Sequence, residues 1–199
     1  GFAGGGFAYL MSSERLASVD DFSGQKLWTP EGDEIAFAAL KSLGIAPVMM
    51  PTTDVLTGLQ TDLLDSVAVP PVAAVVFQWH TRLKFILELP VAYVYGALLI
   101  ERRAFDRMSE ADRAVVREVF ESFYTDFDAT GAGENLEALE ALLDSGLQLV
   151  QPDSRDVQDW KQRVNASHAE QAARGLLDEE LLKELQALLE DYRTKGTGG

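Results

Sequence analysis

Short apolar runs alternate with amphipathic segments over the first hundred residues. The runs are rich in branched and aromatic residues, which favour strands. These predicted strands are 7–11, 25–28, 48–50, 64–69, 84–88 and 92–100. The segments between them repeat apolar residues at helical spacing and predict helices at 34–43, 53–63 and 72–79. Alternation of this kind predicts an α/β lobe with a mostly parallel sheet.

Two of the predicted helices carry an apolar face that we expect to be buried. The faces are Ala36, Ala39 and Leu40 in the first helix, and Leu56, Leu59 and Leu63 in the second. Gly44 follows the first helix and predicts a left-handed cap, and Thr53 or Asp54 can cap the second.

Beyond residue 100 the pattern becomes helical. Ser109 and Asp112 form a capping box, which begins a long helix to about residue 143. One stripe of this helix is apolar and contains Val115, Val119, Phe120, Phe123 and Phe127. A short strand is predicted at 147–150. Asp153 or Ser154 caps a helix to about residue 174, and Asp178 caps a last one to about residue 192.

The stretch from Thr53 to Pro71 contains an unusual charge. Asp65 is the only charged residue of its predicted strand, and Pro70 and Pro71 end that strand because proline fixes φ and lacks a donor. From this stretch alone, a bound group at this place and a purely structural Asp65 fit equally well.

The glycine-rich start, residues 1–6, precedes a strand instead of joining a strand to a helix. This order disfavours a phosphate-binding loop. It favours a flexible lead-in or a crossing point between two lobes.

Composition narrows the function classes. The 199 residues are 47% hydrophobic, which allows one large domain or two small lobes with a real core. The net charge of −15, from 17 basic and 32 acidic residues, argues against nucleic acid or an anionic membrane as partner. No apolar run has the length of a membrane-spanning helix. The chain has no cysteine, and its two histidines lack metal-ligand spacing, so we expect neither a metal site nor a cofactor.

Catalytic motifs are missing from the sequence. It contains no nucleophile elbow, no P-loop and no zinc-protease motif. His80 is expected to be a cap or core residue, and His168 to be solvated on a polar helix. We therefore expect no enzyme, with a hydrolase or transferase that uses Asp65 and His80 as the minor alternative.

Apolar and aromatic residues gather where the predicted strands end. Trp28, Met50 and Val69 stand at three such ends; Met50 and Val69 are each followed by a proline, and Trp28 lies just before Thr29 and Pro30. Ligands bind beyond the carboxyl ends of the strands in an open α/β sheet. The sequence thus suggests an apolar wall there, although residues of these types are most often core.

Three ordered motifs resemble a known family. They are DDFSGQKLWTP, then ALKSLGIAPVMMPTTDVLTGLQTDLLDSVAVPP, then KFILELPVAY. They resemble the periplasmic solute-binding subunits of TRAP transporters (DctP-like), whose pattern contains D-L-x-G-x-K-hydrophobic-R and L-Q-x-G-x-x-D-G-x-E-N-P. Thr53 to Pro70 matches this pattern without a gap, and the resemblance extends from Phe7 to about Val119.

The resemblance implies a periplasmic-binding-protein-like fold. Residues 1–100 are expected to form an α/β ligand-binding lobe, the second lobe of a two-lobed binding protein. Residues 101–199 are expected to form a long bridging helix, one strand and C-terminal helices that pack on both lobes. Nothing in the chain matches the family's earlier segment, so most of the first lobe is expected to be missing.

Three departures from the family pattern bear on the ligand. The family's arginine, which binds a substrate carboxylate, falls on Trp28; its asparagine falls on Val69; and a common histidine falls on Val91. An acid without a cation in a dry cleft is poorly stabilised. We therefore expect a hydrophobic or weakly polar ligand in place of a simple carboxylate. The predicted ligand-binding residues are Trp28, Pro30, Met50, Thr52, Val69, Pro70, Val91 and Tyr93.

The expected function is that of a periplasmic solute-binding receptor of a TRAP-type uptake transporter, with no catalysis. Its expected partners are a small-molecule ligand and the transporter's membrane subunits. The apolar variants also resemble receptors that work with a separate tetratricopeptide-repeat protein. The alternative is a truncated protein-interaction module without a working cleft, whose apolar wall pairs in a homodimer.

Overall fold

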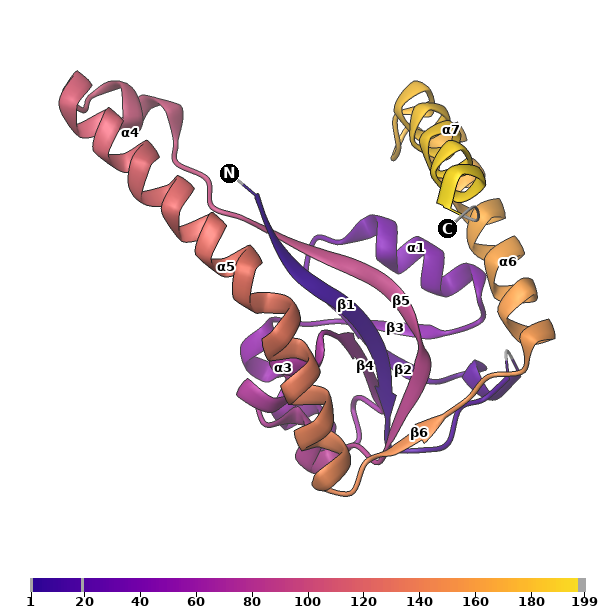
Figure 1. The fold of residues 1–199 in the computed structure, drawn as a ribbon. Helices are drawn as coiled ribbons and strands as arrows, with labels where there is room; N and C mark the ends of the chain where they lie inside the picture. The colour runs from indigo at the N-terminus through magenta and orange to yellow at the C-terminus, as the bar shows by residue number, and fades with distance from the viewer. Residues whose placement is uncertain (1, 19, 197–199) are drawn as a thin grey trace.

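The computed structural model describes residues 2–18 and 20–196. One six-stranded sheet runs through it in the order β3-β2-β4-β1-β5-β6 (Figure 1). The strands are β1 (Phe2–Ser12), β2 (Lys26–Thr29), β3 (Ala46–Met49), β4 (Ser66–Val69), β5 (Phe85–Ala97) and β6 (Gln148–Val150). The helices are α1 (Glu34–Ser42), α2 (Val55–Gln60), α3 (Pro71–Val76), α4 (Arg102–Asp106), α5 (Glu110–Asp144), α6 (Ser154–Ala173) and α7 (Glu179–Gly196). Three 3₁₀ turns lie at Asp20–Phe22, Thr52–Asp54 and Trp79–Arg82.

The sheet is mixed, with mostly parallel pairs. Strands β2 and β3, β2 and β4, and β5 and β6 pair in parallel, whereas β1 runs antiparallel to both β4 and β5. Strands β2, β3, β4 and β5 therefore run in the same direction. Their carboxyl ends lie at the same end of the sheet, which we call its carboxyl edge. The predicted α/β class is confirmed.

Two buried apolar clusters hold the helices to this sheet. The first lies with α2, α3 and α5 and includes Met11, Val67 and Ile86, each 0% exposed. The second lies on the other side with α1 and α6 and includes Leu10 and Leu87. Adjacent residues of one strand thus serve opposite faces, as side-chain alternation in a strand requires.

Strand β5 corrects the sequence analysis. The predicted strands 84–88 and 92–100 are one continuous strand that passes through Pro90. The pairing with β1 is irregular around Tyr9 and Pro90, and β6 pairs with β5 only from Phe85 to Leu87. Pro90 therefore lies where one side of β5 has no partner strand, which is a place where a strand tolerates a missing N–H.

The glycine-rich start is a further correction, because it is strand and not a lead-in. Gly4 and Gly6 lie within β1 where α5 crosses it. The Gly4 N–H donates to Asp128 Oδ1 of α5 at 2.7 Å, and Asn135 Nδ2 of α5 donates to the Gly5 carbonyl at 3.3 Å. The helix backbone approaches β1 this closely because the strand carries no side chains here.

The predicted apolar faces are only partly buried. In the second predicted helix Leu59 is buried, but Leu63 lies beyond the end of α2 and is 59% exposed. The stripe on α5 exists, yet Val119 and Phe123 are more than half exposed. The long helix itself is confirmed, with Ser109 Oγ accepting the Asp112 N–H at 3.1 Å. Among the described residues, no helix is long and apolar enough to span a membrane.

Candidate functional site

A large cavity lies at the carboxyl edge of the sheet, between the sheet, α1 and α6. Its volume is about 1010 Å³, which is large enough for a small organic molecule. Seven of the eight predicted ligand-binding residues line it: Trp28, Pro30, Thr52, Val69, Pro70, Val91 and Tyr93. Parallel strands bring these residues together because their carboxyl ends meet at one edge.

Met50 is the predicted site residue that the cavity does not include. Its side chain packs against the first core cluster, on the side of Gly58, where a Cβ would lie 3.2 Å from the Met50 sulfur. Its carbonyl accepts a hydrogen bond from Trp28 Nε1 at 3.0 Å. Met50 therefore positions the indole of Trp28 through its backbone.

Trp28 belongs to an aromatic cluster beside the cavity. Its ring meets Trp79 edge to face at 5.1 Å between centroids, and Trp79 stacks on Phe77 at 5.0 Å. Both partners line the cavity, and Trp79 is buried. The sequence pattern places Phe77 and Trp79 only in a helix. Their spacing of two residues gives no sign that Trp79 meets Trp28 and that Phe77 stacks on Trp79.

Helix α1 forms one wall of the cavity, although its apolar face was expected to be buried in the core. Ala36, Ala39 and Leu40 line the cavity and are only partly buried. The helix begins at Asp33, whose Oδ1 accepts the Ala36 N–H at 2.9 Å. Gly44 after the helix has φ of +78°, so the left-handed cap is confirmed. The apolar face of α1 thus packs beside the cavity and leaves it open.

Polar lining comes from α6, which the sequence analysis did not connect with the site. Lys161, Asn165 and His168 line the cavity, and His168 is half-buried, so it is less exposed than expected. The spacing of four and three residues, continuing Val157 and Val164, was the signal that could have found this face.

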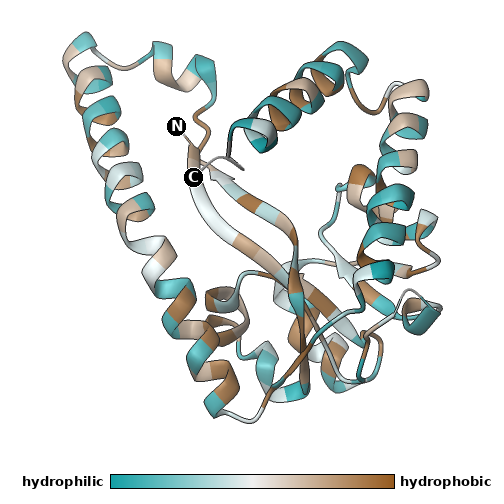
Figure 2. Cartoon of the chain, turned by 45° about the vertical axis from the view of Figure 1, so that its right-hand side comes forward, coloured by the Kyte–Doolittle hydropathy of each residue, from teal (hydrophilic) through white to brown (hydrophobic). Residues whose placement is uncertain are grey.

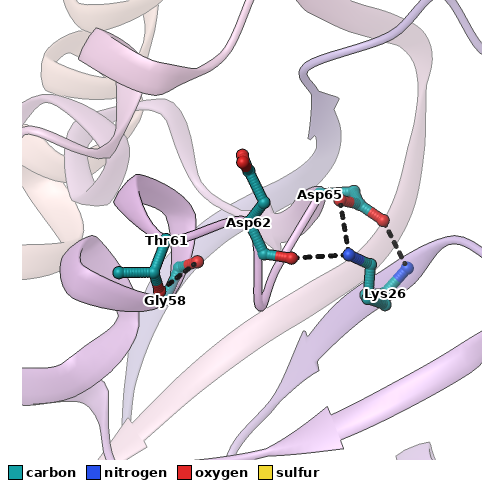
Figure 3. Close-up of polar contacts among 5 residues, drawn as sticks. All are labelled: Lys26, Gly58, Thr61, Asp62 and Asp65. Atoms are coloured by element: carbon teal, nitrogen blue, oxygen red, sulfur yellow. Dashed lines mark hydrogen bonds and ion pairs between the residues drawn. The ribbon is translucent and has the colours of Figure 1, made fainter.

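Asp65 proves to be structural. Its Oδ2 accepts the Lys26 backbone N–H at 3.2 Å, and its Oδ1 pairs with Lys26 Nζ at 3.3 Å (Figure 3). The same Lys26 Nζ donates to the Asp62 carbonyl at 2.5 Å. These contacts fasten the start of β2 to the loop before β4.

The alternative catalytic pair is not assembled. Asp65 pairs with Lys26, whereas His80 Nδ1 lies 3.0 Å from the Ala74 carbonyl oxygen. His80 therefore closes the end of α3, as expected for a cap residue. Within the described part of the chain, no group of three or more His, Asp and Glu side chains could hold a metal ion.

A second cavity, of about 470 Å³, lies on the other face of the sheet under α5. Its walls are aromatic residues of β1 and β5 together with Asp128 and Asn135 of α5. Of the predicted site residues only Tyr93 reaches it, with its ring 4.9 Å from that of Phe7.

A family profile and several solved structures are similar to this chain. The family profile described as bacterial extracellular solute-binding protein, family 7 (DctP) matches residues 1–174. The comparison with curated proteins gives no match.

Several solved structures share the fold. A TRAP periplasmic solute-binding protein from Haemophilus influenzae RdAW with bound L-gulonate has a TM-score of 0.86 at 17% identity, over 94% of this chain and 61% of that one. The periplasmic ectoine-binding protein of the TeaABC TRAP transporter from Halomonas elongata has a TM-score of 0.86 at 19% identity, over 96% and 62%. The sugar acid binding protein DctPAm from Advenella mimigardefordensis DPN7T, in complex with galactonate, has a TM-score of 0.82 at 18% identity, over 86% and 56%. This chain thus spans about 60% of the length of the first two structures, and at these identities the likeness shows the fold.

Proposed function

This chain belongs to the bacterial extracellular solute-binding proteins of family 7, and from that membership we propose that it acts in the solute-binding receptor of a TRAP-type uptake transporter. The family consists of binding proteins and not of enzymes. The observation that supports the proposal most directly is the cavity at the carboxyl edge of the sheet, where seven of eight residues predicted from the sequence lie together. The proposed location is the periplasm, and the proposed partners are the transporter's membrane subunits.

Within this receptor we propose that residues 1–100 are the ligand-binding lobe and residues 101–199 the bridging part. Helix α5 packs on β1 and α3, and α6 packs on α1. Strand β6 extends the sheet beside β5. The second part therefore covers both faces of the sheet that the first part forms.

The proposed ligand is largely apolar and is not a simple carboxylate such as a dicarboxylate. Trp28, Val69 and Val91 line the sheet side of the cavity, and none of them can balance a negative charge there. Transfer of an ionised carboxylate into such surroundings is costly without a paired cation. The indole of Trp28, held by its bond to Met50, offers a flat apolar surface for stacking. The related structures bind gulonate, galactonate and ectoine, so the proposed ligand class departs from theirs.

Ligand titration tests this proposal. The chain is titrated with succinate and with octanoate and 3-phenylpropionate, while tryptophan fluorescence and calorimetry report binding. We expect octanoate and 3-phenylpropionate, which each join one carboxylate to an apolar body, to bind. Trp28→Ala should weaken their binding at least tenfold, because a buried aromatic contact contributes about 1.5–3 kcal/mol.

Tyr192→Ala is the matched control, since it removes an exposed aromatic ring on α7 that does not line the cavity. This variant should bind like the parent chain. Micromolar succinate binding that survives Trp28→Ala would contradict the proposed ligand class. Native mass spectrometry of the purified chain adds an independent readout, because a retained ligand would be seen directly.

The interaction-module alternative, with its homodimer, gains no support from the comparisons. The tetratricopeptide-repeat partner stays a proposal that rests only on the apolar departures at Trp28, Val69 and Val91.

A further inference from the structure

We infer that one face of α6, formed by Lys161, Asn165 and His168, binds the polar end of the ligand, and that the ligand is an amphipathic molecule with a single anionic group. The inference rests on the proposed function, because it assigns an orientation to the ligand in the proposed site. It narrows the ligand class from largely apolar molecules to those with one charged end.

The three residues form a continuous face. They are separated by four and three positions, so they lie on one side of the helix, and all three line the large cavity. Toward the start of α6 the same side is apolar, where Trp160 packs edge to face on Phe22 at 5.1 Å. The cavity side of α6 therefore carries both apolar residues (Val157, Trp160 and Val164) and these polar ones, and hydrophilic stretches are visible along α6 in Figure 2.

The polar groups of these three side chains are not used for polar contacts within the described part of the protein. Over residues 2–18 and 20–196, the side chains of Lys161, Asn165 and His168 form no hydrogen bond or ion pair. Arg163 on the same helix, by contrast, pairs with Asp159 at 2.9 Å and does not line the cavity. The cavity side of α6 thus offers an ammonium group, an amide and an imidazole whose hydrogen-bonding capacity is available to a ligand.

The acidic residue of the lining does not compete for Lys161. Asp33 is the only carboxylate among the described lining residues, and its Oδ1 accepts the Ala36 N–H at the start of α1. A helix N-terminus stabilises a negative charge there. The charge of Lys161 therefore remains available for an anion in the cavity.

The sheet side of the cavity indicates the chemical character of the rest of the ligand. Its walls are the rings of Trp28, Phe77 and Trp79, which accept apolar surface and not charge. Thr29 is the polar exception: it is 1% exposed, lines the cavity, and its Oγ1 has no hydrogen-bond partner in the described structure. A buried hydroxyl without a partner is costly, so a ligand atom that bonds to Thr29 would remove this cost.

A ligand that places an anionic group against α6 and an apolar body against the aromatic cluster complements both walls of the cavity. A dicarboxylate would place its second charge against the rings of Trp28 and Phe77, where no cation lies among the described lining residues of the sheet side. A neutral apolar molecule would leave Lys161 and Asn165, which are exposed, with only water as a partner and would gain nothing from the charge of Lys161. The geometry therefore selects a molecule with one anion.

The test compares each acid with its uncharged amide. Octanoate, octanamide, 3-phenylpropionate and 3-phenylpropanamide are titrated by calorimetry into the parent chain and into Lys161→Ala, His168→Gln and Arg163→Ala. We expect each acid to bind at least tenfold tighter than its amide. Lys161→Ala should reduce this preference at least fivefold, His168→Gln should reduce it less, and Arg163→Ala should leave it unchanged.

These measurements distinguish a failure of the inference from a failure of the proposed ligand class. Equal binding of acid and amide, or an acid preference that Lys161→Ala leaves intact, overturns the inference while the proposed ligand cavity stands. Binding of none of the four compounds overturns both this inference and the proposed ligand class. Circular dichroism of each variant confirms folding, which we expect to be kept because Lys161 is exposed and its side chain forms no hydrogen bond or ion pair with the described residues.

Discussion

At the scale of single residues, polar side chains of this protein divide into those that fasten the backbone and those that face the cavity. Asp65, Asp33 and Ser109 bond to backbone N–H groups of neighbouring elements. Lys161 and His168 face open space. Both kinds look alike in the sequence, because only the direction of the side chain separates them.

Asp65→Asn should destabilise the chain by about 1 kcal/mol, since it removes the charge that Lys26 contacts twice. Urea denaturation at pH 7 measures the change. Asp62→Asn is the control: Asp62 has φ of +56°, which asparagine tolerates, and contacts Lys26 only through its carbonyl. A loss of stability as large in the control as in Asp65→Asn would contradict the assigned role of the Asp65 carboxylate.

Asp21 gives a prediction about pH. Its carboxylate accepts the backbone N–H groups of Ala17 and Ser18, both at 2.8 Å, and these bonds lower the pKa of Asp21 from its ordinary value of 3.8. A lowered pKa in the folded state stabilises the fold above the unfolded pKa, and this contribution is lost as the pH falls through the folded pKa.

Asp21→Ala should therefore cost about 0.5 kcal/mol at neutral pH, because water screens this exposed carboxylate, and the cost should shrink as the pH falls well below 3.8. Urea denaturation of both chains between pH 2 and pH 7 checks this. Asp20→Ala serves as the control because Asp20 is exposed and lies next to Asp21 in the same 3₁₀ turn. A cost that stays constant across this pH range would show that the Asp21 contribution is not electrostatic.

At the scale of elements, the contact between β1 and α5 decides how the long helix lies on the sheet. A Cβ on Gly6 would lie 2.7 Å from Asn135 Nδ2, and Gly6 has φ of +98°. Both the space and the backbone conformation at this position therefore require glycine. The same Asn135 side chain contacts the Gly5 carbonyl, so the helix is bonded to the strand where the glycines lie.

Gly6→Ala should lower the free energy of unfolding by about 1–3 kcal/mol, because it adds backbone strain and a steric clash. Gly133→Ala on α5 is the matched control, since a Cβ there has no atom within 4 Å. It should stabilise the helix by about 0.5–1 kcal/mol. Thermal and urea denaturation measure both, and a neutral Gly6→Ala would contradict the close approach of α5.

At the scale of the whole molecule, stability is unevenly distributed over one sheet. The part of the sheet that packs against α2, α3 and α5 contains Met11, Val67 and Ile86, which are fully buried between helices. The far ends of β1 and β5 form a two-stranded ribbon whose residues Phe2 and Tyr95 are 73% and 69% exposed. A ribbon with few buried contacts opens more readily than the core of the sheet.

Hydrogen exchange should show this difference. The amides of 94–97 should exchange at least tenfold faster than those of 85–87, although both segments belong to β5. Mass spectrometry of peptides from β5 measures the rates. Equal protection along the strand would contradict the uneven stability inferred from burial.

The sequence by itself determined most of the order of elements, the long capped helix, the family and seven residues of the cavity wall. These follow from local periodicity, capping residues and strand ends, which are properties of neighbouring positions. It did not determine which faces are buried: Leu63 and Phe123 follow a core pattern yet are exposed.

Only the tertiary structure decided that α6 borders the cavity and that β5 continues through Pro90. Both depend on contacts between segments far apart in the chain, namely α6 against α1 and β5 between β1 and β6. Helical spacing places Lys161, Asn165 and His168 on one face, but packing alone directs that face to the cavity. Local pattern sets which residues share a face, and long-range packing sets what that face meets.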